Sequence, residues 1–306
     1  MWRTLIVTSG EKLTVKNQWL HVYSEEQEAR VPIGDLYSVV VDNRQAMVSV
    51  AVLTQLAQAG VHVIFCDEKH LPCAELLPMG LHYRPLTTVQ KQMQLTDEFK
   101  NQLWQRIVQA KIQNQAKALR LAGVSGAKAQ KLEEMALAVR LGDSNNREAQ
   151  AAKLYFPALF GLGFTRTQED VTNAALNYGY AIVRSAVSKT LAAYGYSGIL
   201  GIHHIGGGNP FNLADDLMEP LRPLVDLWVD SHCDELYEQL TKTNRKELIG
   251  LVNHPIKLDG KKMRVRYAID RYIKSLTSAI EGQDAGLLLL PELIRFDPLF
   301  EDEQDG

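Results

Sequence analysis

The segment HHIGGGNPFNLADDLMEPLRPLVD, residues 203–226, brings together side chains that can do chemistry. Two histidines precede three consecutive glycines, and three acidic residues follow within five positions. The glycines let the backbone approach a partner closely and let His204 fold back towards the acids. An imidazole and carboxylates near one another are typical of acid–base chemistry or of a site for a divalent cation.

The acidic residues of this segment also have a structural interpretation. Asn212 is expected to cap a helix over 212–231, which places Asp215 and Asp216 in the first turn, where acids complement the helix dipole. Glu219 is harder to explain as a cap, because it lies three and four residues after the two aspartates and shares their helix face. Like charges on one face repel, and a bound cation removes that cost. Spacing therefore favours caps for the two aspartates and leaves a ligand role open for Glu219, although it matches no known metal motif.

Two prolines are predicted to disturb this helix beside its acids. Pro220 and Pro223 have no N–H groups, so the carbonyls of Asp216 and Glu219, four residues earlier, lose their helical partners. We expect the helix to kink or loosen here, which permits unusual placement of ligand side chains.

A second candidate lies in SNNREAQAAKLYFPALFG, residues 144–161. Asn145 as the N-cap would place Glu148 at the third helical position, which is a capping-box arrangement. On spacing alone, Glu148 is therefore a cap more often than a ligand.

A third polar stretch begins with a capping box expected from Thr167 and Asp170. Four polar residues of the helix that follows either line a polar site or, as we favour, pack between helices: Asn173, Asn177, Tyr178 and Tyr180.

The change of hydrophobic period along the chain predicts an α+β protein with more than one domain. Short β-branched and aromatic segments dominate residues 1–76, interrupted by a helix at about 47–59, and predict a small β-rich domain. Residues 77–88 contain two prolines and a glycine and are predicted to be a linker. The remainder, 89–306, has helical periodicity and is predicted to be a larger all-α catalytic domain. Its helices are expected at about 88–121, 126–140, 145–160, 168–194, 212–231 and 264–280, before a disordered acidic end, EDEQDG.

Composition limits the class of protein. Of 306 residues, 46% are apolar and 23% charged, which is typical of a globular chain, and no apolar run reaches the ~18 residues of a membrane helix. Three cysteines without paired spacing favour a reducing cytoplasm over a disulfide framework. Cys66, His70 and Cys73 offer too few ligands at non-standard spacing, so a zinc site is not expected.

The net charge of −3 conceals an uneven distribution. Residues 81–130 carry eight basic against two acidic residues, and residues 254–274 carry seven against two. Such zones can attract phosphate, although on charge alone we favour solvated helix faces.

The order of these segments resembles one family. A strand domain is followed by NNREAQAAKLYF, NAALNYGYAIV and GIHHIGGGNPFNLADDLMEPLRPLVD. This combination is similar to the integrase subunit of the CRISPR adaptation machinery, in its details closest to type II systems. The resemblance covers essentially the whole chain, and DLMEPLRPLVD is its most specific signature.

The resemblance implies a metal site and the residues that form it. The family's glutamate, histidine and acidic ligands fall on Glu148, His204 and Glu219. Asp216 matches a further acid of the catalytic site, in a supporting role. Two carboxylates and one imidazole suit Mg²⁺ or Mn²⁺ and leave positions for phosphate oxygens and water. The chain departs from the family's pattern at Ala149, where many relatives have glycine, and in its additional His203.

The resemblance further implies a metal-dependent DNA integrase and endonuclease. In the family, the 3′-OH of a short duplex attacks a phosphodiester at the edge of a CRISPR repeat. The implied partners are DNA, a second copy of the chain in a homodimer, and a small ferredoxin-like protein that completes a heterohexamer. In type II systems they also include the effector nuclease and a ring-shaped DNA-binding protein. The basic residues then become candidates for DNA backbone contacts: Lys100, Arg106, Lys111, Lys117, Arg120, Lys128, Lys261, Lys262, Arg264 and Arg266.

Two alternatives stay open from the residues alone. The same metal site in a nuclease of branched DNA would cut strands without joining them. In a non-catalytic DNA-binding scaffold, Glu148, Asp216 and Glu219 would be only helix caps.

Overall fold

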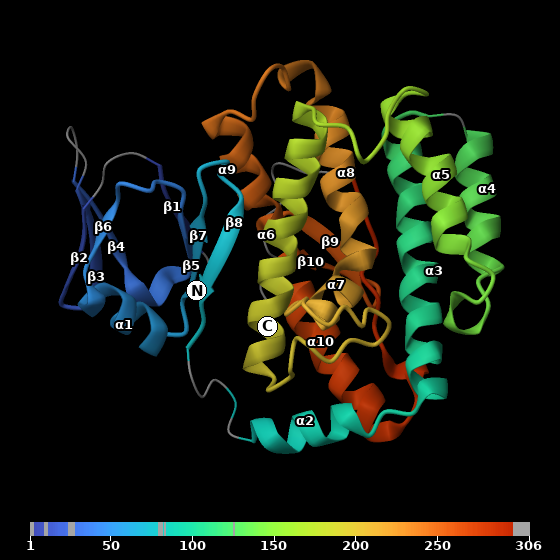
Figure 1. Cartoon of the computed structure of the whole chain (residues 1–306), viewed down its shortest axis with the longest axis horizontal. Helices are drawn as coiled ribbons and strands as arrows, with labels where there is room; N and C mark the ends of the chain where they lie inside the picture. The colour runs from blue at the N-terminus through green and yellow to red at the C-terminus, as the bar shows by residue number, and fades with distance from the viewer. Residues whose placement is uncertain are drawn as a thin grey trace. The chain divides into compact units, whose positions relative to one another are not determined.

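The structure is a computed structural model that describes residues 3–8, 12–23, 28–78, 82, 84–124 and 126–295. The chain divides into two compact units, Met1–Tyr83 and Arg84–Gly306 (Figure 1). The first is rich in strands and the second is mostly helical, which confirms the predicted fold class. The division falls within the segment predicted as a linker, 77–88, although Pro85–Thr88 of that segment are already helical. The end predicted to be disordered lies outside the described residues.

The described part of the first unit consists of two sheets and one α-helix. Its elements are β1 Arg3–Val7, β2 Lys12–Lys16, β3 Trp19–Tyr23, β4 Glu28–Pro32, β5 Leu36–Val41, β6 Met47–Val48, α1 Val50–Gln58, β7 His62–Cys66 and β8 Pro72–Leu76. One sheet has the order β1-β5-β7-β8, with β8 antiparallel and its other pairs parallel. The second sheet has the order β4-β3-β2-β6. Buried side chains from both sheets and α1 form one core, among them Val7, Leu20, Val39, Leu56 and Val63.

The helix predicted at 47–59 begins later than expected. Met47 and Val48 pair with β2 instead, and the Ser49 side chain caps α1 by accepting a hydrogen bond from the Val52 N–H at 3.3 Å. A serine at this place satisfies a free N–H group, so the helix starts after it.

The second unit is built around one long helix. Its elements are α2 Pro85–Met93, α3 Asp97–Leu121, α4 Gly126–Leu137, α5 Arg147–Phe160, α6 Val171–Ala193, α7 Asn212–Met218, α8 Arg222–Ser231, α9 Lys242–Gly250, β9 Pro255–Leu258, β10 Lys261–Arg264 and α10 Val265–Gly282. Helix α3 packs against α4 and α5 on one side and against α7 and α8 on the other (Figure 1). The β9–β10 hairpin was not predicted from the sequence.

The prediction of one helix over 88–121 was wrong, because a cap divides it. Helix α2 ends at Met93, and the Thr96 side chain accepts a hydrogen bond from the Phe99 N–H at 3.2 Å, which starts α3 at Asp97. The capping box expected before α6 was also wrong, because Asp170 alone caps that helix.

No helix of the described residues is long and apolar enough to cross a membrane.

Two of the three residues considered for zinc have other partners. His70 contacts Asp42 at 2.7 Å and the Cys73 thiol donates to the Phe65 carbonyl.

Candidate active site

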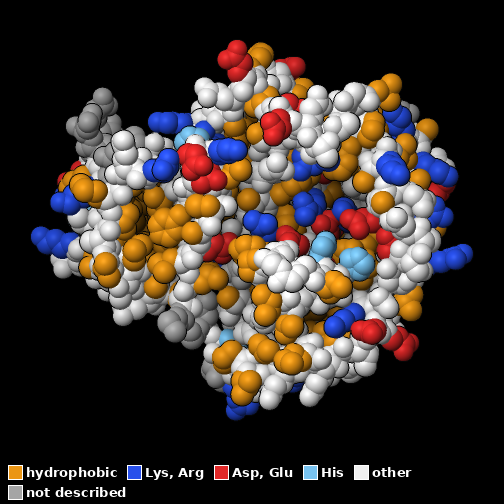
Figure 2. Space-filling model, in the orientation of Figure 1, with side chains coloured by type: hydrophobic (Ala, Val, Ile, Leu, Met, Phe, Trp, Pro, Cys, Tyr) orange, Lys and Arg blue, Asp and Glu red, His pale blue; other side chains and the backbone are white. Residues whose placement is uncertain are grey.

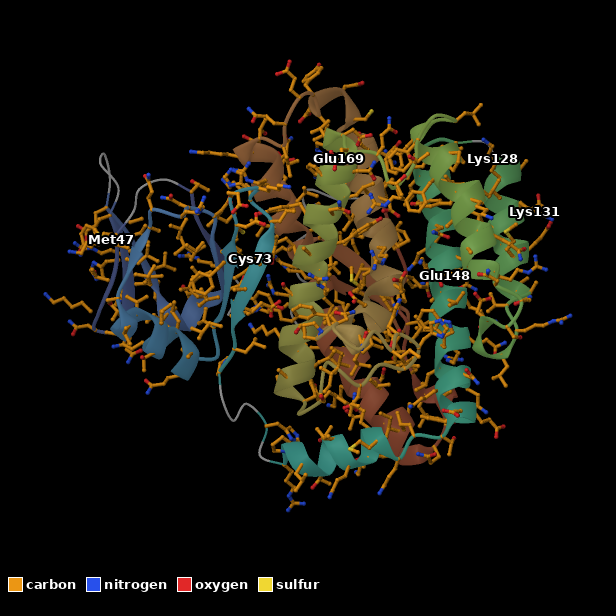
Figure 3. All side chains as sticks on the ribbon, in the orientation of Figure 1. Met47, Cys73, Lys128, Lys131, Glu148 and Glu169 are labelled. Carbon is orange, nitrogen blue, oxygen red and sulfur yellow. The ribbon has the colours of Figure 1, made fainter. Side chains whose placement is uncertain are left out.

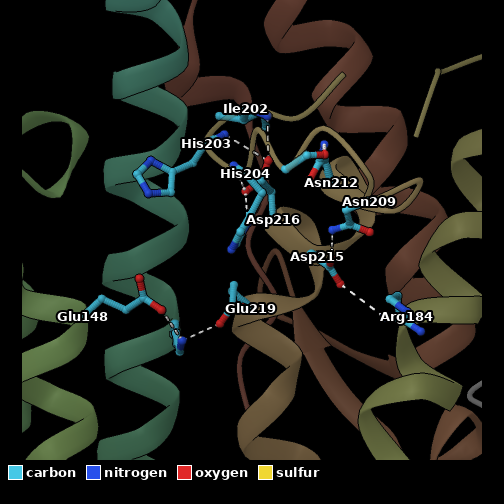
Figure 4. Close-up of polar contacts among 12 residues, drawn as sticks. Glu148, Arg184, Ile202, His203, His204, Asn209, Asn212, Asp215, Asp216 and Glu219 are labelled. Carbon is cyan, nitrogen blue, oxygen red and sulfur yellow. Dashed lines mark hydrogen bonds and ion pairs between the residues drawn. The ribbon is translucent and has the colours of Figure 1, made fainter. Parts of the chain in front are cut away.

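Three helical segments bring two carboxylates to one ammonium group. Lys111 of α3 contacts Glu148 of α5 at 2.5 Å between Nζ and Oε1, and it also contacts Oε2 of Glu219 (Figure 4). The side chain of Glu148 is 31% exposed, whereas that of Glu219 is 4% exposed. Two acids 71 positions apart in the sequence therefore converge on one cationic position that opens to solvent on the Glu148 side.

Glu148 is not a capping residue. The Asp143 side chain accepts hydrogen bonds from the N–H groups of Arg147 at 2.7 Å and Glu148 at 3.1 Å, and so caps α5. Asn145, predicted as the cap, instead bonds the backbone at Ala138 and Arg140. The capping-box interpretation was wrong, and the carboxylate of Glu148 is left to face α3.

Glu219 lies where the predicted helix 212–231 breaks. A 3-10 turn, Glu219–Leu221, separates α7 from α8, which confirms the expected loosening. The Glu219 N–H donates to the Asp216 carbonyl and the Arg222 N–H donates to the Glu219 carbonyl, so shorter-range bonds replace those that prolines cannot make.

Asp216 organises the loop that carries the histidines. Its carboxylate is fully buried and accepts bonds from the N–H groups of Ile202 at 2.6 Å, His203 at 3.0 Å and His204 at 3.1 Å. It also lies 2.6 Å from Nδ1 of His204. A side chain at Gly201 would meet this carboxylate at 3.0 Å, so glycine permits the close approach. Spacing had favoured Asp216 as a cap of its own helix, but its carboxylate bonds to the preceding loop instead.

The two histidines have different surroundings. The ring of His203 stacks on the buried Trp104 of α3, with ring centroids 4.2 Å apart and nearly parallel planes. The ring of His204 stands at 84° to that of His203 and contacts Asp216 (Figure 4). A carboxylate has no proton to donate, so Nδ1 of His204 carries the hydrogen and Nε2 is left as the nitrogen for a ligand or a proton.

Asp215 lies in the first turn of α7, as predicted, whereas Asn212 departs from its predicted role as the N-cap. Asp215 accepts a hydrogen bond from Asn209 at 2.7 Å and pairs with Arg184 at 3.9 Å. Asn212 is the first residue of α7, and its amide donates to the Ile199 and Gly206 carbonyls. The side chains of both residues thus bond to the loop that contains the three glycines or to the segment before it.

Neighbouring charges set the ionisation of the site. Burial raises the pKa of Glu219, but the positive charges of Lys111 and Arg222 outweigh it and lower the pKa to about 2. Burial lowers the pKa of Lys111, and the two glutamates more than reverse this. The hydrogen bond to Asp216 raises the pKa of His204 above its ordinary value.

A second layer of residues supports Arg222. Its Nε donates to Oε1 of Glu219 at 2.7 Å, and its guanidinium lies 4.6 Å from the ring centre of Tyr180. Tyr180 and Tyr155 both donate to the buried Asp226. Tyr180 therefore supports a residue of the site, as a packing residue with a satisfied hydroxyl.

The other three polar residues of that helix either bond to Arg166 or are buried. Arg166 donates to the side chains of Asn173 and Asn177, and Tyr178 is fully buried.

The site offers carboxylate oxygens, which are the ligands that hard divalent cations prefer, but an ammonium lies between them. Among the residues that the structure describes, no three His, Cys, Asp or Glu side chains lie close enough together to hold a metal ion. Glu148 and Glu219 nevertheless direct oxygens at one cationic position, and His204 has its second nitrogen available. Oxygen-rich shells of this kind suit Mg²⁺ and Mn²⁺.

The basic candidates divide into buried and exposed residues. As whole residues, Lys111 and Arg266 are 8% and 3% exposed and contact Glu148 and Asn253, so neither candidate presents a free charge to DNA in this structure. Lys117 and Arg120 pair with Glu292 and Glu133 and remain partly exposed.

Further basic candidates lie nearer the surface. Lys261 and Lys262 are exposed on β10. Lys128 is half-buried and lies on α4 (Figure 3). In the space-filling view, histidine, acidic and basic side chains lie together on the visible face of the second unit (Figure 2).

Comparison with known proteins identifies the family. Residues 4–237 match the family model described as CRISPR associated protein Cas1. This chain belongs to the Cas1 family. The CRISPR-associated endonuclease Cas1 of Neisseria meningitidis serogroup C is 40% identical over 299 residues, covering 96% of this chain and 97% of that protein. The resemblance inferred from the sequence is thereby confirmed.

Solved structures share the Cas1 fold at low identity. A casposase bound to integration product matches with a TM-score of 0.72 and 17% identity, covering 99% of this chain and 95% of that one. A Cas1 protein from Thermotoga maritima matches with a TM-score of 0.71 and 14% identity, covering 92% and 97% of the two chains. A chain of a Cas6-RT-Cas1–Cas2 complex matches with a TM-score of 0.72, and the match covers 98% of this chain and 36% of that one.

Proposed function

We propose that this Cas1 protein is a metal-dependent DNA integrase with an associated endonuclease activity, acting in spacer acquisition by a type II CRISPR system. It joins the 3′-OH ends of short DNA duplexes to phosphodiesters at the edges of a CRISPR repeat. The observation that carries the proposal is the convergence of Glu148 and Glu219 on one cationic position beside His204, which Asp216 holds. The names of the relatives, an endonuclease and a casposase with its integration product, agree with this activity.

Glu148, His204 and Glu219 are the residues that would hold Mg²⁺ or Mn²⁺. The ion, when bound, supplies a Lewis acid that stabilises charge on the attacked phosphate and favours ionisation of the hydroxyl. The residue contacts oppose the scaffold alternative, because neither glutamate nor Asp216 caps the helix on which it lies.

The chain's own residues would position the reaction. The bond from the incoming 3′ oxygen to phosphorus forms while the bond from phosphorus to the 3′ oxygen of the flanking nucleotide breaks. Nε2 of His204 can ligate or take up the hydroxyl proton, because Asp216 keeps the hydrogen on Nδ1. Arg222 holds Oε1 of Glu219, while Oε2 contacts Lys111.

DNA and protein partners complete the proposal. Exposed lysines such as Lys261 and Lys262 would contact the DNA backbone and position it without reading its sequence. The proposed assembly pairs homodimers of this chain with a small ferredoxin-like partner in a heterohexamer. The effector nuclease and a ring-shaped DNA-binding protein would assist spacer capture.

A strand-transfer assay tests the function. A labelled duplex with free 3′-OH ends is mixed with a supercoiled plasmid carrying leader and repeat, with Mg²⁺, Mn²⁺ or EDTA, and with or without the small partner. We expect joining that requires the metal and falls about 100-fold or more in Glu148→Ala, because loss of a ligand exceeds the effect of a supporting residue.

The matched control is Glu134→Ala, which removes an exposed glutamate of α4 and should leave joining unchanged. Cutting without joining, even with the partner, would favour the nuclease of branched DNA, in which water replaces the 3′-OH. Activity in Glu148→Ala equal to wild type would contradict the proposed site.

A further inference from the structure

We propose that Lys111 is an internal counterion, which occupies the cationic position between Glu148 and Glu219 and leaves it when a divalent cation binds. The inference rests on the proposed function, because it concerns the same two carboxylates. It assigns to Lys111 a positioning role in the metal-free protein, in addition to the candidate DNA contact named from the sequence.

The placement of Lys111 supports this role. The side chain is 10% exposed, and its Nζ contacts one oxygen of each glutamate. Arg222 takes the other oxygen, Oε1, of Glu219. The ammonium therefore contacts one oxygen of each of the two glutamates that would hold a divalent cation.

The electrostatic cost of placing two carboxylates close together gives a reason for a lysine at this position. Two carboxylates that face each other in a largely buried site are costly without a positive charge between them. Lys111 supplies that charge in the metal-free protein and holds both side chains near their ligand positions. The same contacts oppose a divalent cation, because the cation must replace the ammonium and tolerate its charge nearby. Lys111 therefore stabilises the metal-free fold and weakens metal affinity.

The exposure of the two glutamates indicates how the ammonium leaves. Glu148 is 31% exposed and Glu219 only 4%, so the open side of the site is that of Glu148. A displaced Lys111 moves towards this side, where it can pair with a phosphate oxygen of bound DNA.

Manganese binding to the full-length, DNA-free protein tests the inference. Free Mn²⁺ is followed by electron paramagnetic resonance during titration of wild type, Lys111→Met and Lys111→Gln. We expect both variants to bind Mn²⁺ about tenfold or more tightly than wild type, because close charge pairs in protein sites couple at least this strongly. In EDTA we expect both variants to melt at a lower temperature than wild type. Saturating Mn²⁺ should reduce this difference in melting temperature.

Lys117→Met is the matched control. Lys117 lies on the same helix as Lys111, but it pairs with Glu292 and not with the two site glutamates. The affinity for Mn²⁺ should therefore not change. Unchanged or weaker Mn²⁺ binding in the Lys111 variants overturns the inference, and the glutamine variant supplies the answer if the methionine variant does not fold. A wild type that neither binds Mn²⁺ nor joins DNA refutes the proposed function instead. A wild type that does both, beside variants of equal affinity, refutes only the role of Lys111.

Discussion

At the residue scale, a buried carboxylate determines both the orientation and the basicity of His204. Asp216 accepts the Nδ1 hydrogen and three backbone N–H bonds of the same loop. We expect Asp216→Asn to lower the pKa of His204 towards its ordinary value of about 6.5, because the hydrogen bond to the carboxylate is the main cause of its rise. An NMR titration of the metal-free protein measures this. Asp215→Asn, which changes the adjacent residue, should lower the pKa much less.

The same contact predicts how stability varies with pH. The folded pKa of His204 is raised, so the pair contributes its full stabilisation below about pH 6.5 and loses it as pH rises through the folded value. Wild type should therefore exceed Asp216→Asn in unfolding free energy by more at pH 5.5 than at pH 8.5. Urea denaturation at the two pH values measures the difference. A gap that is independent of pH would assign the whole effect to the backbone bonds.

At the element scale, Asn114 ties α3 to two other segments. The buried side chain donates to the Pro220 carbonyl at 2.7 Å and to the Pro291 carbonyl at 2.9 Å, and it accepts from the Leu293 N–H at 2.9 Å. Asn114→Ala leaves these groups without that partner, and we expect a loss of about 3 kcal/mol in unfolding free energy, since each unsatisfied buried group costs about 1–3 kcal/mol.

Urea denaturation of the full chain measures the loss. The control is Gln130→Ala, which removes an exposed contact with Glu134 on α4 and should change stability by less than about 0.5 kcal/mol. A loss below about 1 kcal/mol in Asn114→Ala would mean that water replaces the amide at no great cost.

At the scale of the whole molecule, the two units predict two unfolding steps. The first unit has a hydrophobic core of its own, and the proposed metal ligands all lie in the second. We expect calorimetry of the full chain to resolve two transitions, with the larger enthalpy in the unit Arg84–Gly306. Saturating Mn²⁺ should raise the melting temperature of that transition and leave the other unchanged. A single transition that shifts as a whole would show that the units unfold together.

The sequence alone determined the class of fold, because it depends on local periodicity. Alternating and β-branched segments in the first 76 residues and four-residue spacing afterwards predict strands followed by helices, and both were observed. Pro220 likewise allowed the helix break to be predicted, since a missing N–H is a local property. The motifs that carried the family resemblance are also continuous segments.

Only the tertiary structure decided which partners each polar side chain meets. Three residues of a type that often caps helices do not cap the helices for which they were predicted: Asn145, Asn212 and Thr167. Asp143 caps α5 and Asp170 caps α6 instead, because the path of the chain brings their side chains to the free N–H groups. From the sequence, Lys111 was one of several basic residues of a single helix that were candidates for DNA contact. Its burial between two glutamates depends on the packing of α3 against α5 and the 3-10 turn, which no spacing within a single helix encodes.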